Sequence, residues 1–137
     1  MKLFKYTAMA AACAGLVACG GVTEPAELDG QKAFFAFDSS AISSEARDNL
    51  KGQALYMKNH ANVKATIEGH CDERGTEAYN LALGARRANA SKKVITDDGV
   101  DAKRIKTISY GKSRPAVKGT GEDVWKMNRN TTTRVNK

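Results

Sequence analysis

GHCDERGTEAYNLALGARRANA, residues 69–90, decides the fold, because it joins a polar loop to a long helical pattern. Gly69 to Gly75 is typical of a loop, and the helix is expected from Glu77 to about Thr96. Asn80 and Arg87 are seven residues apart, which is two helical turns, so both lie on one stripe of that helix. Asp72 precedes the helix at its electropositive end. A carboxylate there and a guanidinium further along predict a dipolar clamp, with one end for an ammonium group and the other for a carboxylate.

Strand and helix patterns alternate on both sides of this stretch. Short apolar or alternating runs indicate strands, and apolar residues at helical spacing after a Ser43 or Ser44 cap indicate a first helix. This alternation predicts an α/β sandwich in the order βαβαβ(α)β, with the helices packed on one face of a mixed sheet. The expected strands cover residues 33–37, 63–68, 105–110 and 131–135, and the expected helices cover about 44–57, 77–96 and, as a short piece, 122–127.

The start of the chain predicts export and lipidation. Residues 1–18 have a cationic beginning and a short apolar stretch, which is typical of a signal peptide. Leu16-Val17-Ala18 before Cys19 resembles the bacterial lipobox, in which the cysteine receives a lipid and the signal is cut just before it. Gly20 favours the outer membrane over retention in the inner membrane. Residues 19–30 lack a regular period and are expected to form a flexible tether of at most about 40 Å, leaving residues 31–137 as the domain.

Charge and length bound the remaining classes of function. The 137 residues suit one domain, and the formal net charge of +7 raises the possibility of nucleic-acid binding. The signal carries Lys2 and Lys5 and no acid, so its removal leaves +5. An export signal, and the lack of an aromatic and basic platform, argue against a nucleic-acid partner.

Metal and thiol chemistry find little support in the sequence. Adjacent residues in an extended segment point to opposite faces, so His70 and Cys71 do not converge, and no second Cys or His pair completes a zinc site. Cys71 would need a nearby base to act as a nucleophile, and His60 has no motif around it. With Cys19 lipidated and Cys13 lost with the signal, no internal disulfide forms. We therefore expect a binding module without enzymatic activity, metal or cofactor.

Separate motifs in this chain resemble one family. The stretch from Gly69 to Ala90 is similar to the OmpA-like peptidoglycan-binding domain, and its Gly-His-Cys-Asp-Glu-Arg-Gly opening resembles the peptidoglycan-associated lipoproteins in particular. Asn80-x-x-Leu83-Gly84-x-x-Arg87-Ala88 fits the family's helix motif. Ser109-Tyr110-Gly111-Lys112 with Pro115, and then Asn128-Arg129, fit two later motifs. The resemblance covers roughly residues 33–130.

The resemblance implies non-covalent binding of the peptidoglycan stem peptide through meso-diaminopimelate. Asp72 would take the ammonium and Arg87 the carboxylate of that residue's free end. The protein would anchor the outer membrane to the cell wall, with its domain in the periplasm, and would act with the Tol system in envelope integrity and cell division. A partner would be the Tol periplasmic propeller protein, which competes for the same face. Further positions implied at the site are Phe37, Asp38, Arg74, Asn80, Leu83 and Arg129.

Several alternatives stay open. Asp72 could be only a turn residue, Arg87 only a solvated charge, Asn80 a brace for the loop and Phe37 a core residue. The chain could also be an OmpA-like wall-binding lipoprotein outside the Tol system, a stator-type anchor, or a periplasmic metal or thiol protein. It departs from the family where Thr131-Thr132-Thr133 replaces an apolar strand, which predicts an edge position or weaker burial. Asp97-Asp98 places acid at the unfavourable end of a helix.

Overall fold

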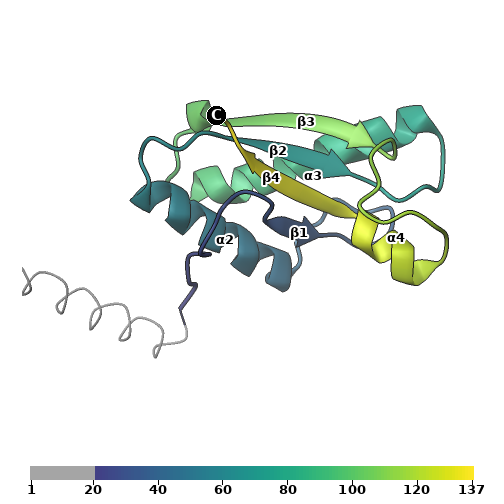
Figure 1. Ribbon diagram of the computed structural model, residues 1–137, viewed down its shortest axis with the longest axis horizontal. Helices are drawn as coiled ribbons and strands as arrows, with labels where there is room; N and C mark the ends of the chain where they lie inside the picture. The colour runs from purple at the N-terminus through teal and green to yellow at the C-terminus, as the bar shows by residue number, and fades with distance from the viewer. Residues whose placement is uncertain (1–20) are drawn as a thin grey trace, which may run out of the picture.

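The computed structural model describes residues 21–137 (Figure 1), so the expected signal peptide and the expected lipidation site at Cys19 lie outside the described residues. The order of elements matches the strand and helix patterns of the sequence. In chain order they are β1 (Lys32–Phe34), α2 (Ser44–Asn59), β2 (Ala65–His70), α3 (Glu77–Asp97), a short 3-10 turn (Ala102–Arg104), β3 (Ile105–Gly111), α4 (Glu122–Asn128) and β4 (Asn130–Val135).

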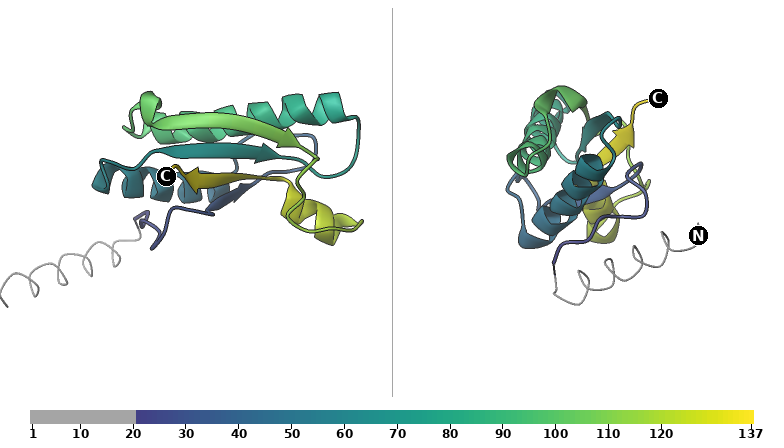
Figure 2. Two further views of the ribbon diagram at one scale, coloured as in Figure 1. Left: turned by 45° about the horizontal axis from the view of Figure 1, so that its top comes forward. Right: turned by 90° about the vertical axis from the view of Figure 1, so that its left-hand side faces the viewer.

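The four strands form one mixed sheet in the order β1-β4-β2-β3. β2 and β3 are parallel, and β4 is antiparallel to both of its neighbours, β1 and β2. The long helices α2 and α3 lie on the same side of the sheet (Figure 2). Helix α4, which follows β3 and precedes β4 in the chain, lies at one end of the sheet. The expected α/β architecture, with helices covering one face of a mixed sheet, is confirmed.

Local sequence explains where the two long helices begin. The Ser43 hydroxyl accepts a hydrogen bond from the amide of Ala46, and the Thr76 hydroxyl accepts one from the amide of Tyr79. Each bond satisfies an N–H group that has no partner inside its helix, and an acidic residue follows in each first turn. The Thr76 cap sets the start of α3, and therefore the position of the polar residues along it.

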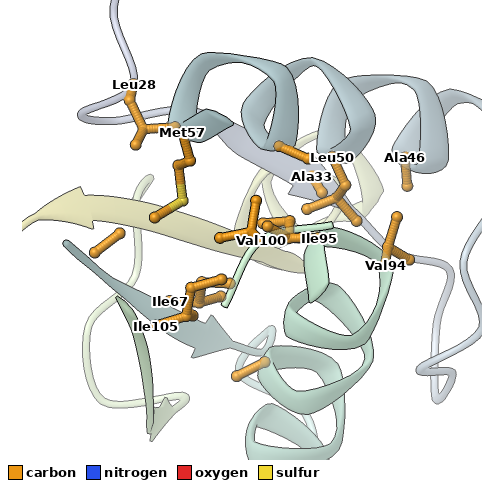
Figure 3. Packing of buried hydrophobic residues seen from close by; sticks show 13 residues of the cluster. Leu28, Ala33, Ala46, Leu50, Met57, Ile67, Val94, Ile95, Val100 and Ile105 are labelled. Carbon is orange, nitrogen blue, oxygen red and sulfur yellow. The ribbon is translucent and has the colours of Figure 1, made fainter. Parts of the chain in front are cut away.

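The core lies between the sheet and the two long helices. Figure 3 shows side chains of α2, α3 and β2 meeting there, with Leu50, Met57, Ile67 and Ile95 almost fully buried. Leu28, which precedes the sheet, is also fully buried in this cluster. The folded domain therefore begins before residue 31, and the expected boundary between tether and domain is corrected to include Leu28.

Two glycines let α3 approach the sheet closely. A Cβ atom on Gly69 in β2 would lie 1.8 Å from the carbonyl oxygen of Gly84 in α3, which is far inside any van der Waals contact. A Cβ atom on Gly84 would lie 2.3 Å from the Ser109 hydroxyl of β3. The close approach brings Arg87, one turn beyond Gly84, over the end of β2.

The threonine-rich strand β4 is central, so the prediction of an edge position or weaker burial is wrong. Thr131, Thr132 and Thr133 are each almost completely buried. Their hydroxyls have partners: Thr131 pairs with Ser91 of α3 at 2.9 Å, and Thr133 donates to the Gln53 side chain of α2. Polar side chains can occupy a central strand here because each finds a hydrogen bond, which removes the cost of burying it.

The acidic end of α3 is compensated within the fold. Asp97 pairs with Lys93 at 3.0 Å, one turn earlier on the helix. Asp98 lies 3.5 Å from Lys58 of α2, whose ammonium also donates to the Asp98 carbonyl oxygen at 2.9 Å. The C-terminal end of a helix carries a partial negative charge, so two carboxylates there are unfavourable. The two lysines supply positive charge that offsets this repulsion.

The chain before β1 lies against α2. A Cβ atom on Gly52 would lie 2.7 Å from the Thr23 carbonyl oxygen, so this glycine makes room for the backbone of the preceding segment. Gly30 further along donates its amide to the Thr133 carbonyl at 2.7 Å. We call residues 21–31 the N-terminal strap.

Candidate functional site

A cavity of about 410 Å³ lies where β2 ends and α3 begins. It contains residues from the loop after β1, the loop after β2 and one face of α3. Seven of the eight positions predicted as ligand contacts line it, and Arg129 does not. The lining residues are Phe37, Asp38, Cys71, Asp72, Arg74, Gly75, Tyr79, Asn80, Leu83 and Arg87.

Asp72 is a buried carboxylate held in place by Arg74. It is 4 % exposed and accepts the Arg74 amide at 3.0 Å, Arg74 Nε at 3.2 Å and Arg74 Nη2 at 2.8 Å. Arg129 approaches the same carboxylate at 3.7 Å. Burial raises the pKa of Asp72, but the hydrogen bonds and charge of Arg74, together with the charge of Arg129, outweigh it and leave this pKa below its ordinary value. Asp72 therefore presents a negative charge at neutral pH.

Arg74 covers Asp72 and is itself held between two aromatic rings. Its guanidinium carbon lies 3.8 Å from the centre of the Phe37 ring and 4.0 Å from that of Trp125 in α4. Such cation–π contacts favour one orientation of the guanidinium. Trp125 was missed by the sequence analysis, because nothing in its surroundings along the chain connects α4 to the loop after β2.

Arg87 is the buried cation of the cavity. It is 1 % exposed, and its guanidinium donates to three backbone carbonyls: Nε to Ser39 at 2.8 Å, Nη1 to His70 at 2.9 Å and Nη2 to Ala36 at 3.0 Å. A guanidinium has five N–H groups, so two remain for other acceptors. The interpretation of Arg87 as only a solvated surface charge is therefore wrong. Burial lowers the pKa of Arg87, and the neighbouring Asp72 opposes that shift.

Asn80 acts as a brace for the loop, one of the two roles considered for it. Its amide nitrogen donates to the Arg74 carbonyl at 2.8 Å and to the Thr76 carbonyl at 3.0 Å. Together with the bonds from Arg74 to Asp72, this fixes the loop between β2 and α3. Leu83 lies one turn along and supplies an apolar wall.

The loop after β1 forms the rim of the cavity. β1 ends at Phe34, earlier than the expected end at residue 37, and Phe37 is 57 % exposed, so the interpretation of Phe37 as a core residue is wrong. Asp38 has a left-handed backbone with φ of 53°, and its carboxylate accepts a hydrogen bond from the Tyr79 hydroxyl. Tyr79 was not predicted as a site residue. The only local feature of the sequence that could have indicated Tyr79 is its position three residues after the Thr76 cap, on the exposed first turn of α3.

Arg129 has other partners. Its side chain donates to the Phe35 carbonyl at 2.9 Å and to Glu122 at 2.6 Å. It is nearly buried behind Asp72, so it adds positive charge close to that carboxylate without lining the cavity.

His70 and Cys71 point to opposite sides of the sheet. Cys71 lines the cavity, and its thiol donates to the Asn80 carbonyl at 3.3 Å, whereas His70 lines a different cavity. Burial raises the pKa of the Cys71 thiol, which keeps it protonated and weakly nucleophilic. Across residues 21–137, no group of three His, Cys, Asp or Glu side chains is arranged to hold a metal ion.

Comparison with known proteins gives consistent results. Residues 34–130 match the model of the OmpA family. The chain is 42 % identical to the peptidoglycan-associated lipoprotein of Agrobacterium fabrum over 124 residues, which cover 87 % of this chain and 70 % of that one. It is 41 % identical to the protein of the same name in Mesorhizobium japonicum over 134 residues, or 94 % and 80 % of the two chains.

Solved structures share this fold. The peptidoglycan-associated lipoprotein of Burkholderia pseudomallei superimposes with a TM-score of 0.75 at 34 % identity, covering 77 % of this chain and 90 % of that one. The C-terminal domain of Helicobacter pylori MotB superimposes with a TM-score of 0.72 at 20 % identity, covering 81 % and 86 %, which shows a common fold only. Among residues 21–137, the helices are too short or too polar to cross a membrane.

Proposed function

The chain belongs to the OmpA family and, within it, to the peptidoglycan-associated lipoproteins, and we propose that it anchors the outer membrane by gripping the wall's stem peptide. The proposed ligand is the free end of meso-diaminopimelate, which carries both an amine and a carboxylate. In this proposal the chain is a binding protein without catalytic activity or cofactor, and it carries a covalent lipid on Cys19.

One observation carries this proposal: a buried carboxylate and a buried guanidinium line the same cavity. Asp72 and Arg87 supply opposite charges for the two ends of one zwitterion, in a volume within the usual range for small-ligand sites. The two unused N–H groups of Arg87 are available to a carboxylate. The ligand's ammonium must share the Asp72 carboxylate with Arg74, which already donates to it. Binding therefore requires the Arg74 guanidinium either to turn away from Asp72 or to remain beside the ligand's positive charge.

The clamp is tested by retention on purified peptidoglycan sacculi. Asp72→Asn keeps the shape of the side chain but removes its charge, and it should weaken retention about tenfold or more, as expected for loss of a charge-assisted hydrogen bond. Glu73→Gln is the matched control, because it removes the adjacent acid, which is exposed and outside the cavity. If Asp72→Asn is retained like the unmodified chain, the clamp is wrong.

The arginine end is better tested through the ligand, because Arg87 also holds the fold together. A soluble stem peptide with a free diaminopimelate carboxylate should release the protein from sacculi. The same peptide with that carboxylate amidated should not, because it offers Arg87 no anion. Equal competition by both peptides would show that Arg87 does not bind the ligand's carboxylate.

The anchor and the partner need separate experiments. Cys19→Ser should abolish incorporation of radiolabelled fatty acid and release the chain from outer-membrane fractions, and continued labelling would assign the lipid to another residue.

We further propose that the Tol periplasmic propeller protein competes for the same face. Adding the Tol propeller protein should displace the OmpA-family chain from sacculi. Sacculus binding with no competition would favour a wall-binding lipoprotein outside the Tol system.

A further inference from the structure

A second polar cavity lies on the face of the sheet opposite α2 and α3. Its volume is about 310 Å³, and it is separate from the cavity that contains Asp72. In β2 the side chains of Ala65 and Ile67 enter the core, so those of Glu68 and His70 point to this other face. Strands β1 and β4 and the loop after β3 complete the lining.

We propose that this cavity binds a phosphate group, either as the free dianion or as the terminal phosphate of a larger molecule. Three permanent cations line it, Lys32, Arg114 and Arg134, against one acid, Glu68. The excess of two positive charges matches a phosphate monoester, which carries about −1.5 to −2 at pH 7. The proposal stands independently of wall binding, because none of these residues lines the clamp.

The cations are short of acidic partners. Within residues 21–137, neither Lys32 nor Arg114 lies within 4.0 Å of a carboxylate. Arg134 lies 3.9 Å from Glu68 and 3.7 Å from Asp29, which is beyond hydrogen-bonding distance in both cases. Burial, and then the charge of Arg134, lower the pKa of Lys32, while Glu68 opposes the shift. Most N–H groups of the three cations are therefore free to donate to an anion.

Buried polar side chains hold Lys32 in position. Its ammonium donates to the Thr132 hydroxyl at 2.8 Å, that hydroxyl donates to the Asn130 side-chain oxygen at 2.8 Å, and the Asn130 amide donates to the Met127 carbonyl at 2.9 Å. Thr132 and Asn130 are each 1 % exposed. A chain of bonds this deeply buried orients the ammonium before any ligand arrives, which reduces the entropy lost on binding.

His70 forms the buried end of the same cavity and reports on it. The side chain is 8 % exposed, its Nε2 lies 3.1 Å from Glu68, and its Nδ1 has no hydrogen-bond partner among residues 21–137. An anion bound beside the imidazole would favour its protonated form. His60 is exposed on the far side of the core, at the end of α2, so it serves as an internal reference.

The test is a titration of the full chain, in maltoside micelles, with phosphate at constant ionic strength. NMR resonances of the two histidine rings monitor the titration. We expect the His70 resonances to shift saturably, those of His60 to stay fixed, and Lys32→Gln to weaken phosphate binding about tenfold or more. Gln can still donate to Thr132, so the fold should persist, which thermal unfolding checks. Lys106→Gln is the matched control, since it removes an exposed charge from β3 outside the cavity.

Two outcomes would overturn the proposal: no saturable shift of His70, or equal weakening by Lys32→Gln and Lys106→Gln, which would indicate general charge attraction. Vesicles of phosphatidic acid in phosphatidylcholine distinguish the source of the phosphate. Binding that exceeds binding to phosphatidylcholine vesicles alone, with the excess reversed by free phosphate, would identify a lipid headgroup, and a response to free phosphate alone would identify a soluble ligand.

Discussion

Arg87 combines two tasks in one side chain. Its three bonds to the carbonyls of Ala36, Ser39 and His70 join the loop after β1 to the end of β2, and the same guanidinium faces the cavity. A residue with both tasks cannot be removed without changing the fold. For this reason, loss of sacculus binding in an Arg87 variant would not by itself identify a ligand contact.

Arg87→Lys should therefore lower the free energy of unfolding by about 3 kcal/mol, because an ammonium cannot reach three separated carbonyls and each bond to a charged group contributes about 1.5–3 kcal/mol. Urea unfolding followed by circular dichroism measures this. Arg86→Lys, on the exposed side of the same turn, is the control and should change stability little. Equal stability of both variants would show that the three bonds do not matter to the fold.

We expect His70 to give the stability of the folded domain a pH dependence. Burial lowers its pKa below the ordinary 6.5, with the charge of Lys32 acting in the same direction and Glu68 opposing it. The Tyr110 ring stacks on the imidazole. The unfolded chain then takes up the proton first as the pH falls, so stability decreases as the pH drops through 6.5 and levels off below the folded pKa. Urea midpoints across this range should show the decrease, His70→Gln should remove it, and His60→Gln should retain it.

At the scale of elements, the contact between β2 and α3 depends on glycine. Gly69→Ala should cost several kcal/mol, about the range for severe overpacking, because the new methyl group would meet the Gly84 carbonyl, which is backbone and cannot rotate away. Gly21→Ala is a suitable control, since nothing lies within 4 Å of its added Cβ atom. Thermal unfolding compares the two variants, and a Gly69→Ala domain as stable as the control would mean that α3 can shift freely.

The order of elements could be predicted from sequence because capping residues and apolar periods are local. Ser43 and Thr76 fix the starts of both long helices from within a few residues. The central place of β4 could not be predicted, because the partners that make Thr131 and Thr133 acceptable in the interior lie on α3 and α2, about 40 and 80 residues away along the chain. A threonine run has the same appearance in sequence whether its hydroxyls face water or buried acceptors.

The candidate site was predicted in part for a similar reason. The residues of the loop after β2 and of α3 are consecutive, so their spacing brings them to one cavity, as it does for Asp72, Asn80 and Arg87. The partners of the guanidinium of Arg74 are not local. Phe37 and Trp125 come from distant parts of the chain, and only the folded domain brings them together around it.

For the whole molecule, the strap against α2 offers a test in which two effects have opposite signs. Gly52→Ala should favour the helix by about 1 kcal/mol through propensity, yet its methyl group would collide with the Thr23 carbonyl. We expect the strap to detach, so that a glutamate-specific protease cleaves after Glu27 faster than in the unmodified chain; the Glu24-Pro25 bond resists such a protease. Unchanged cleavage would show that the strap adapts to the methyl group without leaving α2.

Docking of the strap against α2 shortens the free chain that precedes the domain. If Cys19 carries the lipid, only four peptide units separate the membrane from Thr23, or about 14 Å of extended chain, in place of the roughly 40 Å that a free tether of twelve residues would allow. The domain would then rest close to the membrane surface. The gap between membrane and wall would then be set by the thickness of the fold. A force that pulls the two layers apart would pass through the contact between Thr23 and Gly52 and through the proposed clamp alike, so the weaker of the two would open first.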